Sequence, residues 1–185
     1  MKIKLISLLL IIGSLSSIYA NSPLDSTKID FKISGPGILT CRNSTSNYYV
    51  LEYQGKSASE LYTNVLSAIS SIYNNPEKVL SKVDNVSITI SAYAEVITPN
   101  VNIDFVNIYH YNLQFLFKDN KIRINAPSFD SENILNYLFG EYNKVAPLFS
   151  MHFNGSDDEF AKSLQTYLNS LIINIIQKSE TINNW

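Results

Sequence analysis

Two runs of alternating apolar and polar side chains, on either side of Asp119 and Asn120, constrain the fold of this chain more than any other feature. The stretch extends from Tyr109 to Ala126. A two-residue loop of this kind is typical of a tight β-hairpin, and it fixes the register so that Leu116 faces Arg123. The sequence therefore predicts a hairpin with one face for burial and one face for solvent.

The two faces of this hairpin differ in chemistry. The apolar face can pack beneath a helix, and it consists of Tyr109, Tyr111, Leu113, Phe115, Phe117, Ile122, Ile124 and Ala126. The polar face carries His110, Asn112, Gln114, Leu116, Lys118, Lys121, Arg123 and Asn125. His110 and Arg123 are about six residue positions apart along this face, too far to share a catalytic task directly. We expect Asp119 to offset the repulsion between Lys118 and Lys121, and Leu116 to support the stem of Arg123.

Other alternating runs predict more strands of the same sheet. Val86–Ile97 places Val86, Ile88, Ile90, Ala92, Ala94 and Val96 on one face, with Ser87, Thr89, Ser91, Tyr93 and Glu95 on the other. One apolar and one polar face indicate an antiparallel sheet that is wet on one side. Residues 47–53 and 78–84 predict two shorter strands. In the preceding lead-in, residues 21–45, the alternating Ile29, Phe31 and Ile33 indicate either an edge strand or a tether.

Three segments have helical periodicity. A capping box of Ser57 and Glu60 starts the first helix, which ends before Pro76. A second helix is predicted to start at Asp130 or Ser131 and continue to about residue 145. The third is the longest, and a second capping box, Ser156 and Glu159, precedes its apolar stripe. That stripe consists of Phe160, Leu164, Tyr167, Leu168, Leu171, Ile172, Ile175 and Ile176.

The order of these elements predicts an α+β fold. It is a β-α-β4-α order, with an antiparallel sheet covered on one face by helices and an extra long C-terminal helix. We assign residues 46–180 to a single domain and residues 181–185 to a C-terminal tail.

The N-terminus predicts export. Lys2 and Lys4 precede an apolar run, and small polar residues follow as far as Ala20, which is the pattern of a secretory signal peptide. The apolar run is shorter than the roughly 20 residues that span a bilayer, although an uncleaved anchor remains the alternative. We expect cleavage after Ala20 and a periplasmic or extracellular location without a transmembrane segment.

Charge and cysteine content narrow the possible functions. Loss of residues 1–20 leaves 12 Lys and Arg against 16 Asp and Glu, a net charge of −4. Such a chain lacks the basic surface that nucleic acids require. About 165 residues suffice for a core without disulfides, which agrees with the presence of one cysteine. We interpret Cys41 as a small, buried or half-buried core residue.

Eight residues carry a resemblance to a known family: Ser57, Glu60, Leu61, Tyr62, Lys118, Asp119, Lys121 and Arg123. Over residues 47–126 the chain resembles exported domains of unknown function, known chiefly from Bacteroidetes, whose fold is like half of the TATA-binding protein (TBP). The resemblance implies a TBP-like (β-α-β4-α) domain. It implies no active site, because the family has none agreed, and DNA binding does not follow from a fold alone.

Catalytic motifs are absent from the sequence. His110 and His152 are 42 residues apart and have no ligand spacing for zinc, and no cofactor motif is present. We therefore predict no enzyme.

The main hypothesis is a binding or interaction module of the cell envelope, with an unknown envelope protein or small ligand as partner. Its expected surface comprises Tyr93, His110, Asn112, Gln114 and Arg123. The alternative is a carrier of a small apolar ligand, or an enzyme, that uses a cavity between the sheet and the C-terminal helix.

Overall fold

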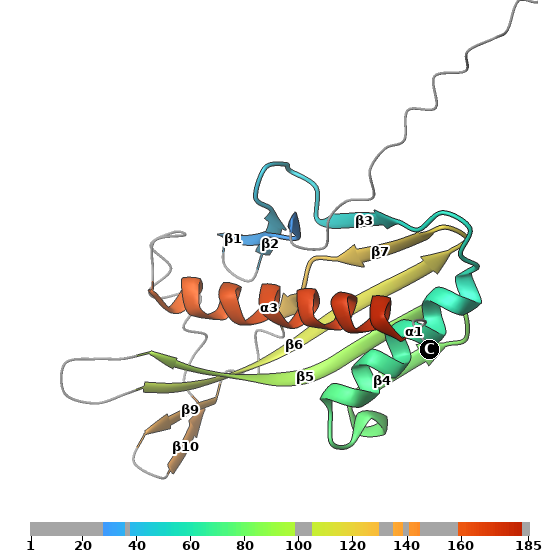
Figure 1. The fold of residues 1–185 in the computed structure, drawn as a ribbon. Coiled ribbons are helices and arrows are strands. Elements are labelled where there is room, and N and C mark those ends of the chain that lie inside the picture. The colour runs from blue at the N-terminus through green and yellow to red at the C-terminus, as the bar shows by residue number, and fades with distance from the viewer. Residues whose placement is uncertain are drawn as a thin grey trace, which may run out of the picture.

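The fold is an antiparallel sheet with two helices on one face, as the computed structural model shows (Figure 1). The structure describes residues 28–35, 38–98, 105–129, 135–138, 141–144 and 159–182. The strands of this sheet are β3 (Tyr48–Glu52), β4 (Leu80–Val83), β5 (Ser87–Thr98), β6 (Phe105–Lys118), β7 (Lys121–Asn125), β8 (Ser128–Phe129), β9 (Leu135–Leu138) and β10 (Glu141–Lys144). The predicted α+β class and antiparallel sheet are confirmed.

Strand β6 organises the sheet. It pairs with β5 along twelve residue positions, from Ser87↔Leu116 to Thr98↔Phe105. Its C-terminal half pairs with β7, and β7 in turn pairs with β3. The predicted hairpin register is confirmed, because Leu116 lies opposite Arg123. Asn120 has φ 65°, a left-handed conformation that asparagine tolerates better than most residues.

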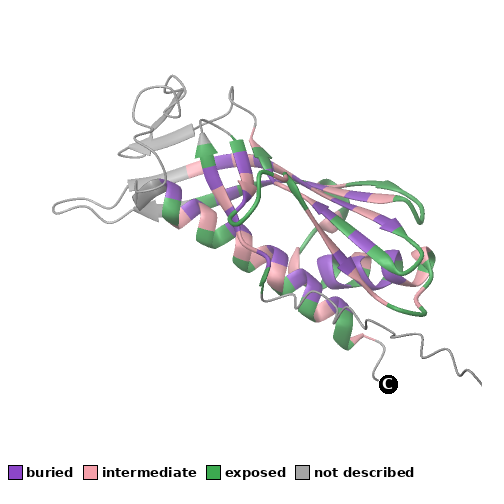
Figure 2. Ribbon diagram, turned by 90° about the horizontal axis from the view of Figure 1, so that it is seen from above, coloured by how far each residue is buried: buried purple, intermediate pink, exposed green. Residues whose placement is uncertain are grey.

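The core lies between the sheet and the helices. The alternating apolar residues on the inner side of β5, β6 and β7 are buried, and Figure 2 colours the buried residues of the described part purple. Phe115, Leu113 and Ile124 are each 0% exposed. Val86 is a correction, because it is 52% exposed rather than part of the apolar face. It lies in the turn between β4 and β5, just before the regular alternation of β5 begins.

Helix α1 (Ala58–Ile72) begins where the sequence predicts. The Ser57 hydroxyl accepts a hydrogen bond from the backbone N–H of Glu60, at 3.1 Å, which is the first half of the predicted capping box. The Glu60 carboxylate also forms an ion pair with Lys56. After α1, a short 3-10 helix, η2 (Pro76–Lys78), leads into β4.

Helix α3 (Glu159–Thr181) lies across the inner face of the sheet, and its C-terminal end reaches α1 (Figure 1). Most of the predicted stripe is buried, namely Leu164, Leu168, Ile172, Ile175 and Ile176. Tyr167, in contrast, is 36% exposed at the edge of the stripe. The proposed N-cap at Ser156 lies outside the described residues.

The lead-in contributes to the core. Strands β1 (Phe31–Gly35) and β2 (Ile38–Cys41) form a two-stranded sheet that is separate from the main sheet. The segment is therefore a strand rather than a tether, but among the described residues it does not pair with an edge of the main sheet. The side chain of Asn169 on α3 accepts a hydrogen bond from the Phe31 N–H and donates one to the Phe31 carbonyl, both at 2.9 Å. The Asn169 carboxamide thus pairs with the backbone groups of Phe31 in the way that a neighbouring strand would. The hydrophobic core includes Ile29, Phe31, Ile33, Leu39 and Cys41, which all precede residue 46.

The predicted helix over residues 130–145 is wrong. Residues 135–138 and 141–144 form the antiparallel strands β9 and β10, and β9 pairs with β6 at Val106–Ile108. The long N-terminal half of β6 would otherwise leave backbone groups unpaired on this edge. Asparagine and tyrosine, which are frequent in this stretch of the sequence, and glycine are also weak helix formers, so pairing with the sheet overrides the helical spacing of the apolar residues.

Several sequence predictions concern residues outside the described part of the chain. These are the signal peptide with its cleavage after Ala20, the zinc candidate His152 and the end of the predicted tail. Within the described residues, no helix is long and apolar enough to cross a membrane.

Candidate binding surface on the outer sheet face

All five residues predicted for an interaction surface lie on the sheet face opposite the helices. Tyr93 on β5 and His110 on β6 are register partners, and their ring centroids are 5.0 Å apart. Asn112 and Gln114 follow on β6, and Arg123 lies on β7. Tyr93 is 59% exposed, so this pair presents an aromatic surface to solvent. We call this side of the sheet the outer face.

A chain of hydrogen bonds crosses the outer face from β5 to β7. The Gln114 carboxamide donates to the Thr89 hydroxyl at 3.4 Å and accepts from the Asn125 carboxamide at 2.7 Å. Asn125 in turn accepts from Nε of Arg123 at 2.8 Å. Ser91 donates to Asn112 one step further along. These contacts fix the planar amides in one orientation.

Arg123 is held from a second direction by Tyr48 on β3. The guanidinium carbon lies 3.9 Å from the centre of the Tyr48 ring, a cation–π contact. Stacking uses the flat face of the guanidinium and leaves its edge N–H groups available for a planar acceptor. The sequence predicts Leu116 as the support for this side chain, and Leu116 is its cross-strand partner. The contact with Tyr48 could not be predicted, because it depends on the pairing of β3 with β7.

A depression of about 440 Å³ lies beside Arg123 on this face. It is lined by Asn47, Thr89, Asn112, Gln114, Arg123, Asn125, Ala126 and Ser128. Three of the five predicted residues line it, whereas Tyr93 and His110 lie outside it. Arg123 is the one charged residue in this lining, and no carboxylate balances it. The depression therefore offers amide and hydroxyl groups around a single cation.

His110 and Arg123 do not share a site. His110 stacks against Tyr93, and its Nδ1 atom is buried without a hydrogen-bond partner among the described residues. Arg123 is engaged with Asn125 and Tyr48 instead. The separation inferred from the strand register is thus confirmed.

From the sequence, Asp119 is expected to offset the repulsion between Lys118 and Lys121, but the structure gives Asp119 and Lys121 other partners. Asp119 accepts a hydrogen bond from the backbone N–H of Ala58 at 2.9 Å, and Lys121 forms an ion pair with Glu52 at 3.1 Å. The carboxylate of Asp119 thus caps helix α1, and Glu52 on the neighbouring strand offsets the charge of Lys121.

Cys41 is a core residue. It is 3% exposed, and its thiol donates to the Tyr48 carbonyl at 3.3 Å. Burial raises the pKa of this thiol above its ordinary value, which disfavours the nucleophilic thiolate. Within the described residues, no three His, Cys, Asp or Glu side chains gather as metal ligands.

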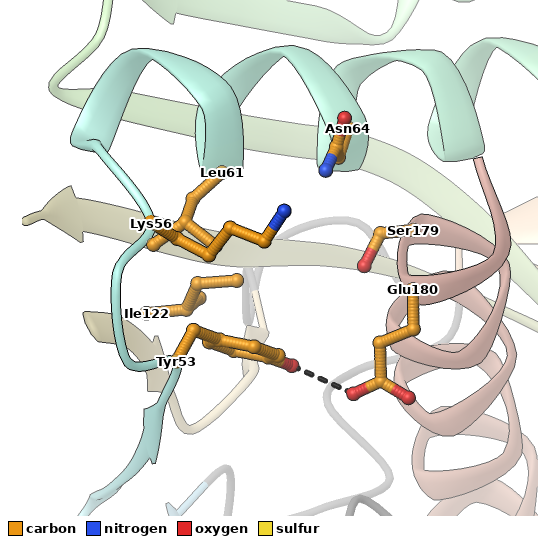
Figure 3. A pocket seen from close by; sticks show the side chains of 7 residues that line it. All are labelled: Tyr53, Lys56, Leu61, Asn64, Ile122, Ser179 and Glu180. Atoms are coloured by element: carbon orange, nitrogen blue, oxygen red, sulfur yellow. Dashed lines mark hydrogen bonds between the residues drawn. The ribbon is translucent and has the colours of Figure 1, made fainter. Parts of the chain in front are cut away.

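A second cavity, of about 280 Å³, lies between the helices and the sheet near the C-terminal end of α3 (Figure 3). It is lined by Tyr53, Lys56, Leu61, Asn64, Ile122, Ser179 and Glu180. The Tyr53 hydroxyl donates to the Glu180 carboxylate at 2.9 Å. Burial, reinforced by this carboxylate, raises the pKa of Tyr53, so the phenol stays protonated.

Comparison with known proteins shows the fold. No family model and no curated protein matches the sequence. A TBP-like protein from Parabacteroides distasonis superposes with a TM-score of 0.53 at 13% identity, over 72% of this chain and 90% of that one. A DUF4468 family protein from Bacteroides ovatus gives a TM-score of 0.50 at 6% identity, over 71% and 84% of the two chains. The predicted TBP-like fold is confirmed, with structural relatives from Bacteroidetes, and neither name carries a molecular function.

Proposed function

We propose that the protein is an exported, non-catalytic binding module of the bacterial cell envelope that engages its partner through the outer face. The observation that carries this proposal is that two neighbouring side chains fix the orientation of the Arg123 guanidinium. Its guanidinium is stacked on Tyr48 and hydrogen-bonded to Asn125, beside a depression that contains no acidic side chain. An arginine held in this way recognises a carboxylate at low entropic cost.

The surrounding side chains support recognition rather than reaction. Thr89, Gln114 and Asn125 form one connected hydrogen-bond chain of neutral groups. Such groups orient a polar partner but cannot exchange protons near neutral pH. We infer that the partner presents a carboxylate flanked by hydrogen-bonding groups, as the surface of an acidic envelope protein would.

Affinity capture tests this function. Mature wild-type protein and two variants are used to recover partners from the native envelope, followed by mass spectrometry. We expect Arg123→Ala to lose a partner that the wild type recovers reproducibly. Lys162→Ala, which removes an exposed cation on α3, should retain that partner. Equal recovery by both variants, or recovery of a lipid or metabolite alone, would contradict the use of the outer face.

The second cavity bears on the alternative of a small-ligand carrier. Apolar carriers need a lining that is mostly hydrophobic. Five of the seven residues that line this cavity have polar side-chain ends, and the apolar side chains are Leu61 and Ile122. A carrier of an apolar ligand is therefore not favoured at this position.

A further inference from the structure

Three elements that are distant in the sequence enclose the second cavity. Tyr53 and Lys56 belong to the connection between β3 and α1, and Ile122 lies on β7. The last turns of α3 close the opposite side, as Figure 3 shows. The cavity is separate from the depression beside Arg123, because the two linings have no residue in common.

Asn64 is a polar group in the cavity whose side chain has no hydrogen-bond partner among the described residues. It is 8% exposed on the inner side of α1, and its side chain points toward the cavity (Figure 3). None of the described residues forms a hydrogen bond with its carboxamide. A carboxamide has two donors and two acceptor lone pairs. The Asn64 carboxamide lines the cavity, so a molecule in the cavity can hydrogen-bond to it in place of water.

The charges around the cavity are of both signs and lie on opposite sides. Lys56 precedes Ser57, the N-cap of α1, and so lies near the positive end of the helix dipole. Glu180 lies in the last turn of α3, where the dipole is negative. Figure 3 shows the Lys56 ammonium and the Glu180 carboxylate on either side of the space below Asn64. Lys56 also forms an ion pair with Glu60, and Glu180 also accepts a hydrogen bond from Tyr53. A ligand with separated positive and negative groups can contact both charged side chains, whereas an ion of one sign can contact only one of them favourably.

We propose that this cavity binds a small zwitterion of the free α-amino-acid class. Its carboxylate lies toward Lys56 and its ammonium toward Glu180, while the Asn64 carboxamide hydrogen-bonds between them. Leu61 and Ile122 provide an apolar surface for the ligand side chain. A volume of about 280 Å³ corresponds to roughly nine water molecules of about 30 Å³ each, which is enough room for a small amino acid.

Calorimetric titration of the mature protein with single free L-amino acids tests this site. We expect saturable binding of at least one of them. Its N-acetyl derivative and its carboxamide derivative, each of which removes one charge, should bind about tenfold more weakly or worse. Absence of saturable heat for every amino acid at millimolar concentration would refute the site. Equal binding of the charge-blocked derivatives would refute the zwitterion.

Variants separate this site from the outer face. Lys56→Met and Glu180→Gln should each weaken binding about tenfold, because each removes one charged contact. Both residues lie at the rim, so a thermal melt is expected to show that the variants remain folded. Arg123→Ala should bind the amino acid as the wild type does, whatever its effect on envelope capture. Unchanged affinity in both rim variants would overturn the assignment.

Discussion

At the scale of single residues, Arg123 shows how an exposed side chain is fixed by its neighbours. Tyr48 supplies the ring beneath it, and Asn125 holds Nε in the plane of the sheet. Neither contact requires burial of the charge, so the guanidinium retains its solvation while its orientation is restricted. The contacts with Tyr48 and Asn125 therefore stabilise the fold little, but they determine the direction in which the guanidinium N–H groups point.

The opposite face of the same hairpin carries the stability. Phe115 is 0% exposed, so Phe115→Asp would bury a carboxylate in the core without a partner. We expect loss of the folded state, measured as loss of the thermal transition. Arg123→Ala removes an exposed side chain and should leave the transition within a few degrees of the wild type. Similar destabilisation by both changes would show that the assigned faces are wrong.

Ionisation of the buried Tyr111 phenol is expected to affect the stability of the protein at alkaline pH. It is 0% exposed, and its hydroxyl lies 2.8 Å from that of Tyr73. Burial, followed by the hydrogen bond with Tyr73, raises the pKa of Tyr111 in the folded protein above its ordinary value of 10.0. Above that pH the unfolded chain loses this proton first, so the free energy of unfolding falls as the pH rises.

We therefore expect the melting temperature to fall as the pH rises above about 10. Tyr111→Phe should make this fall shallower, because the variant has no phenol to ionise at this position. At neutral pH the same change should cost about 0.5–1.5 kcal/mol, the worth of one hydrogen bond. Melting curves at several alkaline pH values measure both effects. Identical pH slopes for the two proteins would exclude Tyr111 as a source of the alkaline instability.

At the scale of elements, the tip of the β6–β7 hairpin is joined to the start of α1. The backbone N–H and C=O of Asn120 bond to Lys56 and Tyr53, and its side chain accepts from the Gly55 N–H at 2.7 Å. Asp119 accepts from Ala58 at 2.9 Å. The two segments that carry the family resemblance, residues 57–62 and 118–123, thus meet in space through the contact of Ala58 with Asp119, which indicates a structural role for this motif.

Removal of the Asp119 carboxylate tests this junction. Asp119→Ala leaves an N-terminal N–H of α1 without its acceptor, and we expect a loss of about 0.5–2 kcal/mol in the free energy of unfolding. Urea denaturation measures this loss. Lys118→Ala, at the adjacent exposed position, is the matched control and should change stability by less than about 0.5 kcal/mol. Equal effects would mean that Asp119 acts through charge at the tip rather than as a cap.

At the scale of the whole molecule, the two faces of the sheet have separate tasks. The inner face packs against α1 and α3, and the cavity with Asn64 lies at the junction of these helices with the sheet. The outer face retains its polar groups, and in the described part of the chain no helix packs on it (Figure 2). A partner on the outer face and a ligand in the cavity could therefore be bound independently.

The proposed export also concerns the whole molecule. If the signal peptide is removed as its pattern predicts, protein purified from its native source begins at Asn21. N-terminal sequencing or intact mass spectrometry measures this start. The same gene expressed without a secretion pathway should retain the leader and serves as the control. A native chain that begins at Met1 would contradict cleavage.

Part of this structure follows from the sequence alone, because it depends on residues close together in the chain. The period-two alternation fixes which side chains of β5, β6 and β7 are buried, and the Asp119-Asn120 turn fixes the register. The cap at Ser57 fixes the start of α1. For the candidate surface, these local rules placed all five predicted residues on one face.

The tertiary structure alone decided which distant segments meet. It placed Tyr48 against Arg123 and Phe31 against Asn169. It also brought the end of α3 to the cavity that Asn64 on α1 lines. It also made strands of residues 135–138 and 141–144, because backbone groups at the edge of β6 are satisfied by pairing with β9. Such contacts depend on the packing of the whole chain, so no local pattern in the sequence specifies them.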